Sequence, residues 1–187
     1  MTRKGLLLLG FALAAALHLG VPASMIWSKE RVLSEGEVFK FRTAPVDPYD
    51  AFRGRYVALA FQEHSAPLRS GQSFERGQEV YAIVEKAEDG FARFTRVETQ
   101  APAQGDYVRV RVTHVYPKHD VSFDLPFDRF YMNERLAPGA EKAYAELSRD
   151  EKSEACALVR VKDGQAAIEQ VFVSGIPLAD FAKLMGD

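Results

Sequence analysis

Residues Tyr107 to Val115 read YVRVRVTHV, and this stretch decides the fold class. Its valines alternate with Arg109, Arg111 and Thr113, so one face of the stretch is apolar and the other is polar. A period of two is typical of a β-strand with one buried face and one face in water. We therefore expect a β-rich domain that contains this strand.

Similar runs precede this strand along the chain. Tyr56 to Phe61, Glu79 to Glu85 and Ala92 to Glu98 are short and rich in apolar residues, and glycine turns separate them. Asp89-Gly90 lies between the second and the third run, and Asp-Gly is a typical centre of a two-residue hairpin. Short strands with such turns predict an antiparallel sandwich or a partly open barrel.

The pattern changes towards the C-terminus. Residues 140–149 are rich in helix formers and predict a helix. Asp163-Gly164, a second hairpin signal, joins the strands expected at Ala155 to Val161 and Ala166 to Val173. Residues 176–185 predict a short final helix. The sequence thus predicts an α+β fold whose C-terminal part is a helix-hairpin unit.

An uncharged stretch lies at the N-terminus. Gly5 to Trp27 read GLLLLGFALAAALHLGVPASMIW. As a helix this stretch spans about 34 Å, enough for the hydrocarbon core of a bilayer. A cleaved signal peptide would use the same residues, with Arg3 and Lys4 as its charged start. The apolar run continues to Trp27, which favours an uncleaved signal anchor.

The anchor divides the chain into two parts. We expect a signal-anchor transmembrane helix over residues 1–28, in contact with the lipid bilayer through residues 5–27. Residues 29–187 then form one extracytoplasmic β-rich domain, because the basic N-terminus favours the cytoplasm.

The composition excludes several classes of function. The formal net charge is −2 and no long Lys/Arg run occurs, so the sequence predicts no nucleic-acid partner and no polybasic surface for anionic lipids. Cys156 is the single cysteine, which excludes an intrachain disulfide, and its apolar surroundings predict a small buried side chain. His114 and His119 lack the spacing of a metal motif. No cofactor and no metal site is therefore predicted.

Charged residues cluster before the strand expected at Tyr56. Asp47, Asp50, Arg53 and Arg55 lie within nine residues of one another, next to Gly54. Arginine–carboxylate pairs could fix the geometry of this loop. Alternatively, the same groups and Tyr56 could bind a ligand or a protein partner.

This segment resembles the signature of the GDYXXLXY family of uncharacterised bacterial membrane-anchored proteins. The family pattern runs roughly Asp-Pro, then Arg-Gly-Asp-Tyr-x-x-Leu-x-Tyr, and the matching residues are Asp47, Pro48, Arg53, Gly54, Tyr56 and Leu59. Arg55 replaces the acid of the pattern, and Phe61 replaces its final tyrosine. The resemblance implies a single-pass protein of the cell inner membrane whose main domain is periplasmic or extracellular. It implies no established activity.

A second polar cluster follows the expected strands and also resembles the later part of the family. It contains Asp124, Asp128, Arg129, Tyr131 and Glu134. Carboxylates at this spacing could converge for acid–base chemistry or cation binding. The same stretch is rich in aromatic residues, which favours the rim of a hydrophobic core.

These observations lead to two functional hypotheses. The first is an interaction or accessory domain for an integral membrane protein, and it is favoured because no catalytic constellation is recognisable. Under this hypothesis both polar clusters are candidates for partner or ligand binding. The alternative is a membrane-bound hydrolase or ligand-binding protein that acts on an envelope component through the second cluster.

Overall fold

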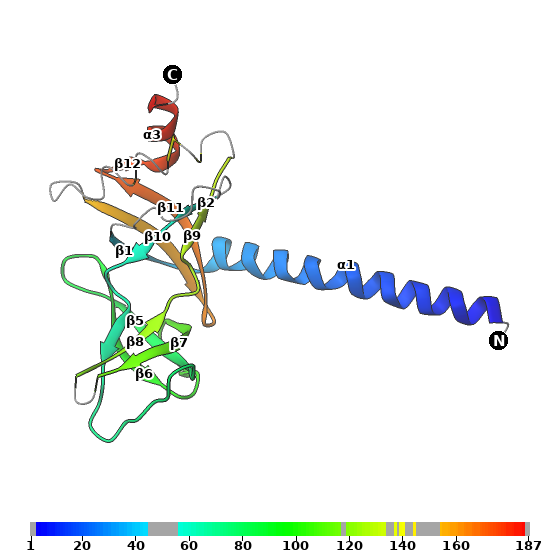
Figure 1. Ribbon diagram of the computed structural model, residues 1–187, viewed down its shortest axis with the longest axis horizontal. Coiled ribbons are helices and arrows are strands. Elements are labelled where there is room, and N and C mark those ends of the chain that lie inside the picture. The colour runs from blue at the N-terminus through cyan, green and yellow to red at the C-terminus, as the bar shows by residue number, and fades with distance from the viewer. Residues whose placement is uncertain are drawn as a thin grey trace.

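A long N-terminal helix precedes a β-rich domain. The computed structural model describes residues 3–44, 56–116, 119–133, 137, 139–140, 144 and 154–185. Helix α1 (Arg3–Glu35) contains the apolar stretch and continues past Ser28 into the part of the chain expected to belong to the domain. Figure 1 shows α1 leaving the domain and running free of it to the N-terminus.

Five antiparallel strands form the first sheet, in the order β12-β11-β10-β1-β3. They are β1 (Glu37–Ala44), β3 (Ala60–Phe61), β10 (Ala155–Lys162), β11 (Gln165–Val173) and β12 (Ile176–Pro177). The expected hairpin at Asp163-Gly164 joins β10 to β11, with both residues at positive φ. The sheet follows α1 directly, because β1 begins two residues after the helix ends.

A second set of five antiparallel strands curls into a nearly closed barrel, in the order β4-β8-β7-β5-β6. These strands are β4 (Ser65–Pro67), β5 (Glu79–Lys86), β6 (Ala92–Glu98), β7 (Tyr107–Val115) and β8 (Asp120–Asp124). The two edge strands, β4 and β6, lie against each other. Of the two alternatives predicted from the sequence, a sandwich or a partly open barrel, the barrel describes this sheet, and β7 is its central strand.

A short two-stranded ribbon accompanies the two sheets. Strand β2 (Tyr56–Ala58) pairs with β9 (Arg129–Tyr131). The prediction of one continuous strand over residues 56–61 is wrong, because β2 and β3 pair with different partners. Leu59 lies between them and donates its backbone N–H to the carbonyl of Asp128 at 2.9 Å.

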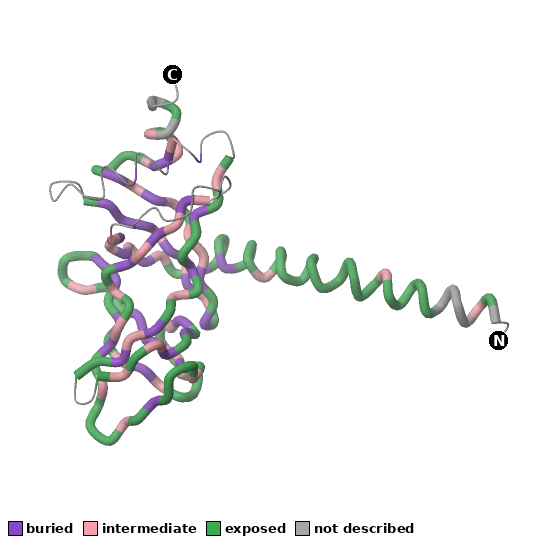
Figure 2. The backbone as a smooth tube through the Cα atoms, in the orientation of Figure 1, coloured by how far each residue is buried: buried purple, intermediate pink, exposed green. Residues whose placement is uncertain are grey.

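A shared hydrophobic core joins the sheet to the barrel. Phe41 of β1 is fully buried, and its ring lies 5.7 Å from Phe94 of β6 and 5.4 Å from Phe127, between ring centroids. Such aromatic pairs add about 0.5–1.5 kcal/mol beyond the area that they bury. Figure 2 shows buried residues throughout the strands, whereas α1 is exposed along most of its length.

The C-terminal part is organised around the β-hairpin. Ala140 and Tyr144 of the helix expected over residues 140–149 are helical, and residues 141–143 and 145–149 lie outside the described residues. Tyr144 is buried, and its hydroxyl donates a hydrogen bond to the carbonyl of Ala44 at 3.0 Å. Helix α3 (Leu178–Met185) follows the hairpin. The expected helix-hairpin unit needs correction, because the described C-terminal residues contain a β-hairpin but no hairpin of helices.

Candidate functional site

The β2–β9 ribbon presents an aromatic strip to solvent. In this antiparallel pair Tyr56 lies opposite Tyr131, and Val57 lies opposite Phe130. Val57 and Phe130 point into the core, so their neighbours project to the other face because side chains alternate along a strand. The rings of Tyr56 and Tyr131 are 5.6 Å apart, and Tyr131 is 66% exposed.

Arg129 completes this strip. Its guanidinium carbon lies 5.2 Å from the centre of the Tyr56 ring, the distance of a cation–π contact. Its Nε lies 3.6 Å from Oδ1 of Asp128. Hydrogen bonding with Tyr131 and the nearby charge of Asp128 raise the pKa of Arg129. We call Tyr56, Arg129 and Tyr131 the Tyr-Arg-Tyr strip.

A cleft of about 590 Å³ lies between this ribbon, the end of α1 and β11. Residues 126–131 form one wall, Lys29 and Leu33 of α1 contribute to a second wall, and residues 166–168 of β11 complete it. The cleft therefore places Tyr131 and Arg129 beside the part of α1 that follows its apolar stretch.

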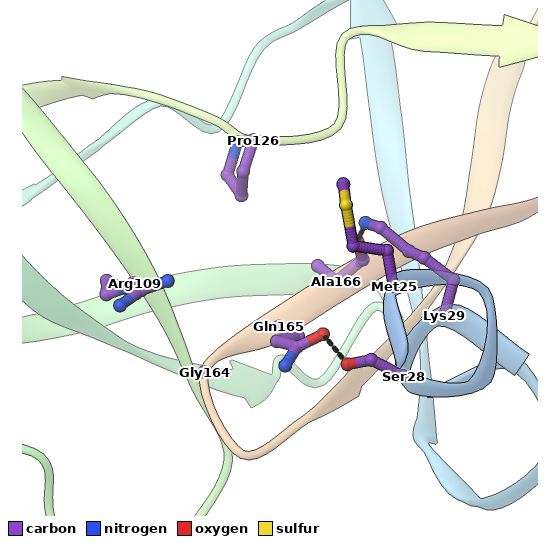
Figure 3. A pocket seen from close by; sticks show the side chains of 8 residues that line it. All are labelled: Met25, Ser28, Lys29, Arg109, Pro126, Gly164, Gln165 and Ala166. Carbon is purple, nitrogen blue, oxygen red and sulfur yellow. Dashed lines mark hydrogen bonds between the residues drawn. The ribbon is translucent and has the colours of Figure 1, made fainter. Parts of the chain in front are cut away.

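A smaller cleft of about 330 Å³ adjoins the first and shares Lys29, Pro126 and Ala166 with it. Figure 3 shows Lys29 and Met25 on one side of this cleft and Arg109 on the other. The two clefts thus lie side by side at the base of α1. We call the two adjoining clefts together the helix-base groove.

The tip of the β10–β11 hairpin forms hydrogen bonds with both α1 and β7. Ser28 donates a hydrogen bond to Oε1 of Gln165 at 2.8 Å, and Nζ of Lys29 donates to the carbonyl of Ala166 at 3.1 Å (Figure 3). On the other side of the tip, the carbonyl of Gly164 accepts the N–H of Arg109 at 2.9 Å. The hairpin tip thus connects α1 to the barrel.

Gly164 is required at this junction for a steric reason. Its φ is +77°, which disfavours residues with a side chain. A Cβ atom there would also lie 2.9 Å from Cε2 of Tyr107. The Asp-Gly signal in the sequence therefore marks both a hairpin turn and a close approach to β7.

The structure joins parts of the two predicted clusters. Tyr56 comes from the first cluster, and Arg129 and Tyr131 come from the second. Asp124 lies elsewhere, at the end of β8 and opposite Arg111 of β7. The candidates that lie outside the described residues are Asp47, Asp50, Arg53, Gly54, Arg55 and Glu134.

The described carboxylates do not form a convergent acid pair in the groove. Asp128 lines it and interacts with Arg129, but Asp124 is not among the lining residues. Within the described part of the chain, no group of three or more His, Cys, Asp or Glu side chains lies close enough to hold a metal ion. Exposed aromatic rings beside a guanidinium suit binding better than proton transfer.

Sequence reasoning did not identify Lys29 and Arg109, the two cations of the smaller cleft. Lys29 and Arg109 are 80 residues apart and meet only because the hairpin tip docks between them. It also did not identify a third cleft of about 310 Å³ beside Glu37 and Asp106. Partial burial and the charge of Glu37 raise the pKa of Asp106 there. Cys156 is buried as predicted, and burial raises the pKa of its thiol.

Comparisons with known proteins agree with the signature around Tyr56. A family model described as GDYXXLXY protein matches residues 18–171, which include the second half of α1, the barrel, the ribbon and most of the β10–β11 hairpin. No curated protein and no solved structure matches the chain. Because the family model covers most of its length, the chain belongs to the GDYXXLXY family.

Proposed function

We propose that the chain is a single-pass membrane protein whose β-rich domain is an accessory or interaction module for an integral membrane protein. The apolar stretch of α1 supports the anchor. A window within Gly10–Glu35 has a mean hydropathy of 1.5 and is 0% buried, so α1 is long and apolar enough to cross a membrane. A signal peptide has the same features, but α1 continues as one helix to Glu35 and packs on the domain.

The orientation follows from the charges that flank the helix. Arg3 and Lys4 precede the apolar stretch and favour the cytoplasmic side. The domain then lies on the periplasmic side of the inner membrane in a cell with two membranes. Trp27, at the end of the stretch, is 74% exposed and suits the interface between lipid and water.

The observation that carries the interaction function is the Tyr-Arg-Tyr strip. Tyrosine and arginine are enriched at protein interfaces, where a few such residues contribute most of the binding free energy. The strip borders the groove beside Lys29 and Leu33, at the base of α1. A partner that leaves the same bilayer next to α1 would meet this strip first.

The test compares two exposed tyrosines in the full-length protein. We expect Tyr131→Ala to reduce by about tenfold or more the recovery of one specific integral membrane protein from detergent-solubilised membranes. Tyr116→Ala is the matched control, because Tyr116 is 50% exposed and is not part of the strip. Thermal melts establish that both variants are folded. Equal recovery with the wild type, Tyr131→Ala and Tyr116→Ala would contradict the assignment.

The signature segment gives a second arm of the same test. Asp47, Asp50, Arg53 and Arg55 precede Tyr56 in the chain, and we propose that they extend the same interaction face. Arg53→Ala should release the partner without changing the melting temperature. If both the melt and the association stay unchanged, Arg53 does not belong to the face.

A further inference from the structure

The smaller cleft of the helix-base groove lies beside α1 at the point where its apolar stretch ends. Met25 belongs to the apolar stretch, whereas Ser28 and Lys29 are the first polar residues after it. If α1 spans a bilayer, which is part of the proposed function, these residues lie at the level of the lipid headgroups. The cleft therefore opens where the phosphate groups of lipids are found.

The two charged side chains of this cleft are both cations, and its neutral polar groups can also donate hydrogen bonds. Lys29 and Arg109 line it, and no carboxylate is among its lining residues. Lys29 uses one proton for the carbonyl of Ala166, which leaves two ammonium protons. The amide oxygen of Gln165 accepts from Ser28, so its amide nitrogen remains as a further donor.

Arg109 differs from the next arginine on the same face of β7. Arg111 has its guanidinium 3.8 Å from Glu79. Arg109 forms no ion pair within the part of the chain that the structure describes, although its side chain is exposed. An arginine that faces a cleft without a carboxylate is available for an anion, and its planar fork fits phosphate oxygens.

The apolar side of the cleft indicates the source of the anion. Met25 is 66% exposed and continues into the apolar surface of α1, and Pro126 lies across from it (Figure 3). A soluble phosphate would leave this surface uncovered. A lipid would place its phosphate between Lys29 and Arg109 and its acyl chains along Met25 and the apolar residues that precede it.

We propose that this cleft binds the phosphate group of an anionic membrane lipid. The cleft has the volume of a small-ligand site, for which about 300 Å³ is the lower end of the usual range. The binding is local rather than diffuse, because the sequence contains no long Lys/Arg run. Lys29 and Arg109 supply the charge, and the hairpin tip positions them through the carbonyls of Ala166 and Gly164.

The experiment titrates the full-length protein with lipid in detergent micelles and counts bound lipids by native mass spectrometry. We expect one phosphatidylglycerol to bind saturably and more tightly than phosphatidylcholine. Arg109→Gln should weaken this binding by about tenfold, because it removes a charge-assisted hydrogen bond. Arg111→Gln is the matched control on the same strand and should bind as the wild type does.

Two results would overturn the proposal. Inorganic phosphate that competes with phosphatidylglycerol at equal concentration would assign the cleft to a soluble anion. Equal lipid binding by the wild type and Arg109→Gln, with unchanged thermal melts, would show that the cleft is not the site. Carbonate extraction of membranes tests the anchor separately: a chain that stays in the membrane but binds no lipid contradicts only this site, whereas an extracted chain contradicts the proposed function.

Discussion

The two halves of α1 belong to one helix, but only the second half packs against the rest of the protein. None of the described residues between Lys4 and Trp27 is buried, although the stretch is almost entirely apolar. After Ser28 the helix has charged residues, yet Val32 is only 3% exposed because it packs on the domain. The exposed first half fits the proposed membrane anchor, whereas the second half packs on the folded domain.

Aspartate substitutions in the two halves give the largest expected effects. Val32→Asp places an unpaired charge in a buried position and should lower the free energy of unfolding by about 3 kcal/mol or more. Leu17→Asp changes a side chain that is 66% exposed, so the domain should keep its stability. It should instead disfavour membrane insertion by about 3 kcal/mol.

Two measurements separate these effects. Urea denaturation of the purified chain reports the stability of the domain, and the carbonate-resistant fraction of membranes reports insertion. Val32→Asp should affect the first, and Leu17→Asp should affect the second. The comparison fails if Leu17→Asp destabilises the domain or if Val32→Asp does not.

The junction between α1 and the barrel should be sensitive to a single methyl group. In Gly164→Ala the new methyl group is strained by the positive φ and also clashes with the Tyr107 ring. We therefore expect a loss of about 2–3 kcal/mol in the free energy of unfolding. Gly90→Ala is the control, because Gly90 has φ +79° in the β5–β6 turn with nothing within 4 Å of its added Cβ. It should lose only about 1 kcal/mol.

The difference between the two glycine variants measures the packing at the junction, and denaturant titration provides both values. Gly164→Ala should also loosen the contact between the hairpin tip and α1, which faster amide hydrogen exchange at residues 28–35 would report. Equal losses for both variants would mean that the Tyr107 ring moves aside at no cost.

Arg160 provides a smaller test of how the second half of α1 is held. Its guanidinium contacts both carboxylate oxygens of Glu169, at 2.8 and 3.2 Å, and donates to the carbonyl of Gly36 at 3.0 Å, directly after the helix. Arg160→Ala should cost about 1–2 kcal/mol of stability. Arg93→Ala removes a more exposed pair with Asp89 and should cost less than about 1 kcal/mol. Thermal melts that rank these variants in the opposite order would contradict the role of Arg160.

The sequence predicts this fold well where the signal is local. The strands expected at residues 92–98 and 107–115 have the observed bounds, because alternation and the Asp-Gly turn act over a few residues. The break at Leu59 escaped prediction because its cause is a hydrogen bond to Asp128, which is 69 residues away. The pairing of Tyr56 with Tyr131 depends on sheet topology in the same way, so the two polar clusters looked separate.

The groove was not predicted for the same reason, because it is formed by residues that are far apart in the sequence. Lys29 and Arg109 are unremarkable in sequence, and neither belongs to a motif. They become neighbours in one cleft only through the docking of the hairpin tip on α1 and on β7. A count of charges along the chain indicates an acidic domain. Such a count cannot show that two cations line one cleft with no carboxylate among its lining residues.

The smallest expected effects concern pH, and they differ between the helix end and the barrel. Hydrogen bonds from Lys162 and Arg31 lower the pKa of Glu35 below its usual 4.5. This carboxylate therefore stabilises the fold above its usual pKa, and the contribution is lost as the pH falls through the lowered value. Asp106 behaves in the opposite way: its raised pKa favours the protonated form, so the associated stability is lost as the pH rises through that value.

Matched amide variants should reveal this opposition. Glu35→Gln should slightly lower the melting temperature at pH 7 and leave it unchanged well below pH 4. Asp106→Asn should raise the melting temperature at pH 7 and lose this advantage in acid. The corresponding gain in the free energy of unfolding should be less than about 1 kcal/mol, because the group is partly solvated. Melts of the two variants from pH 3 to pH 7 therefore diverge in opposite directions from the wild type. Curves that shift in the same direction would contradict this comparison. They would mean that the cations near Glu35 do not stabilise its carboxylate more than the surroundings of Asp106 stabilise that of Asp106.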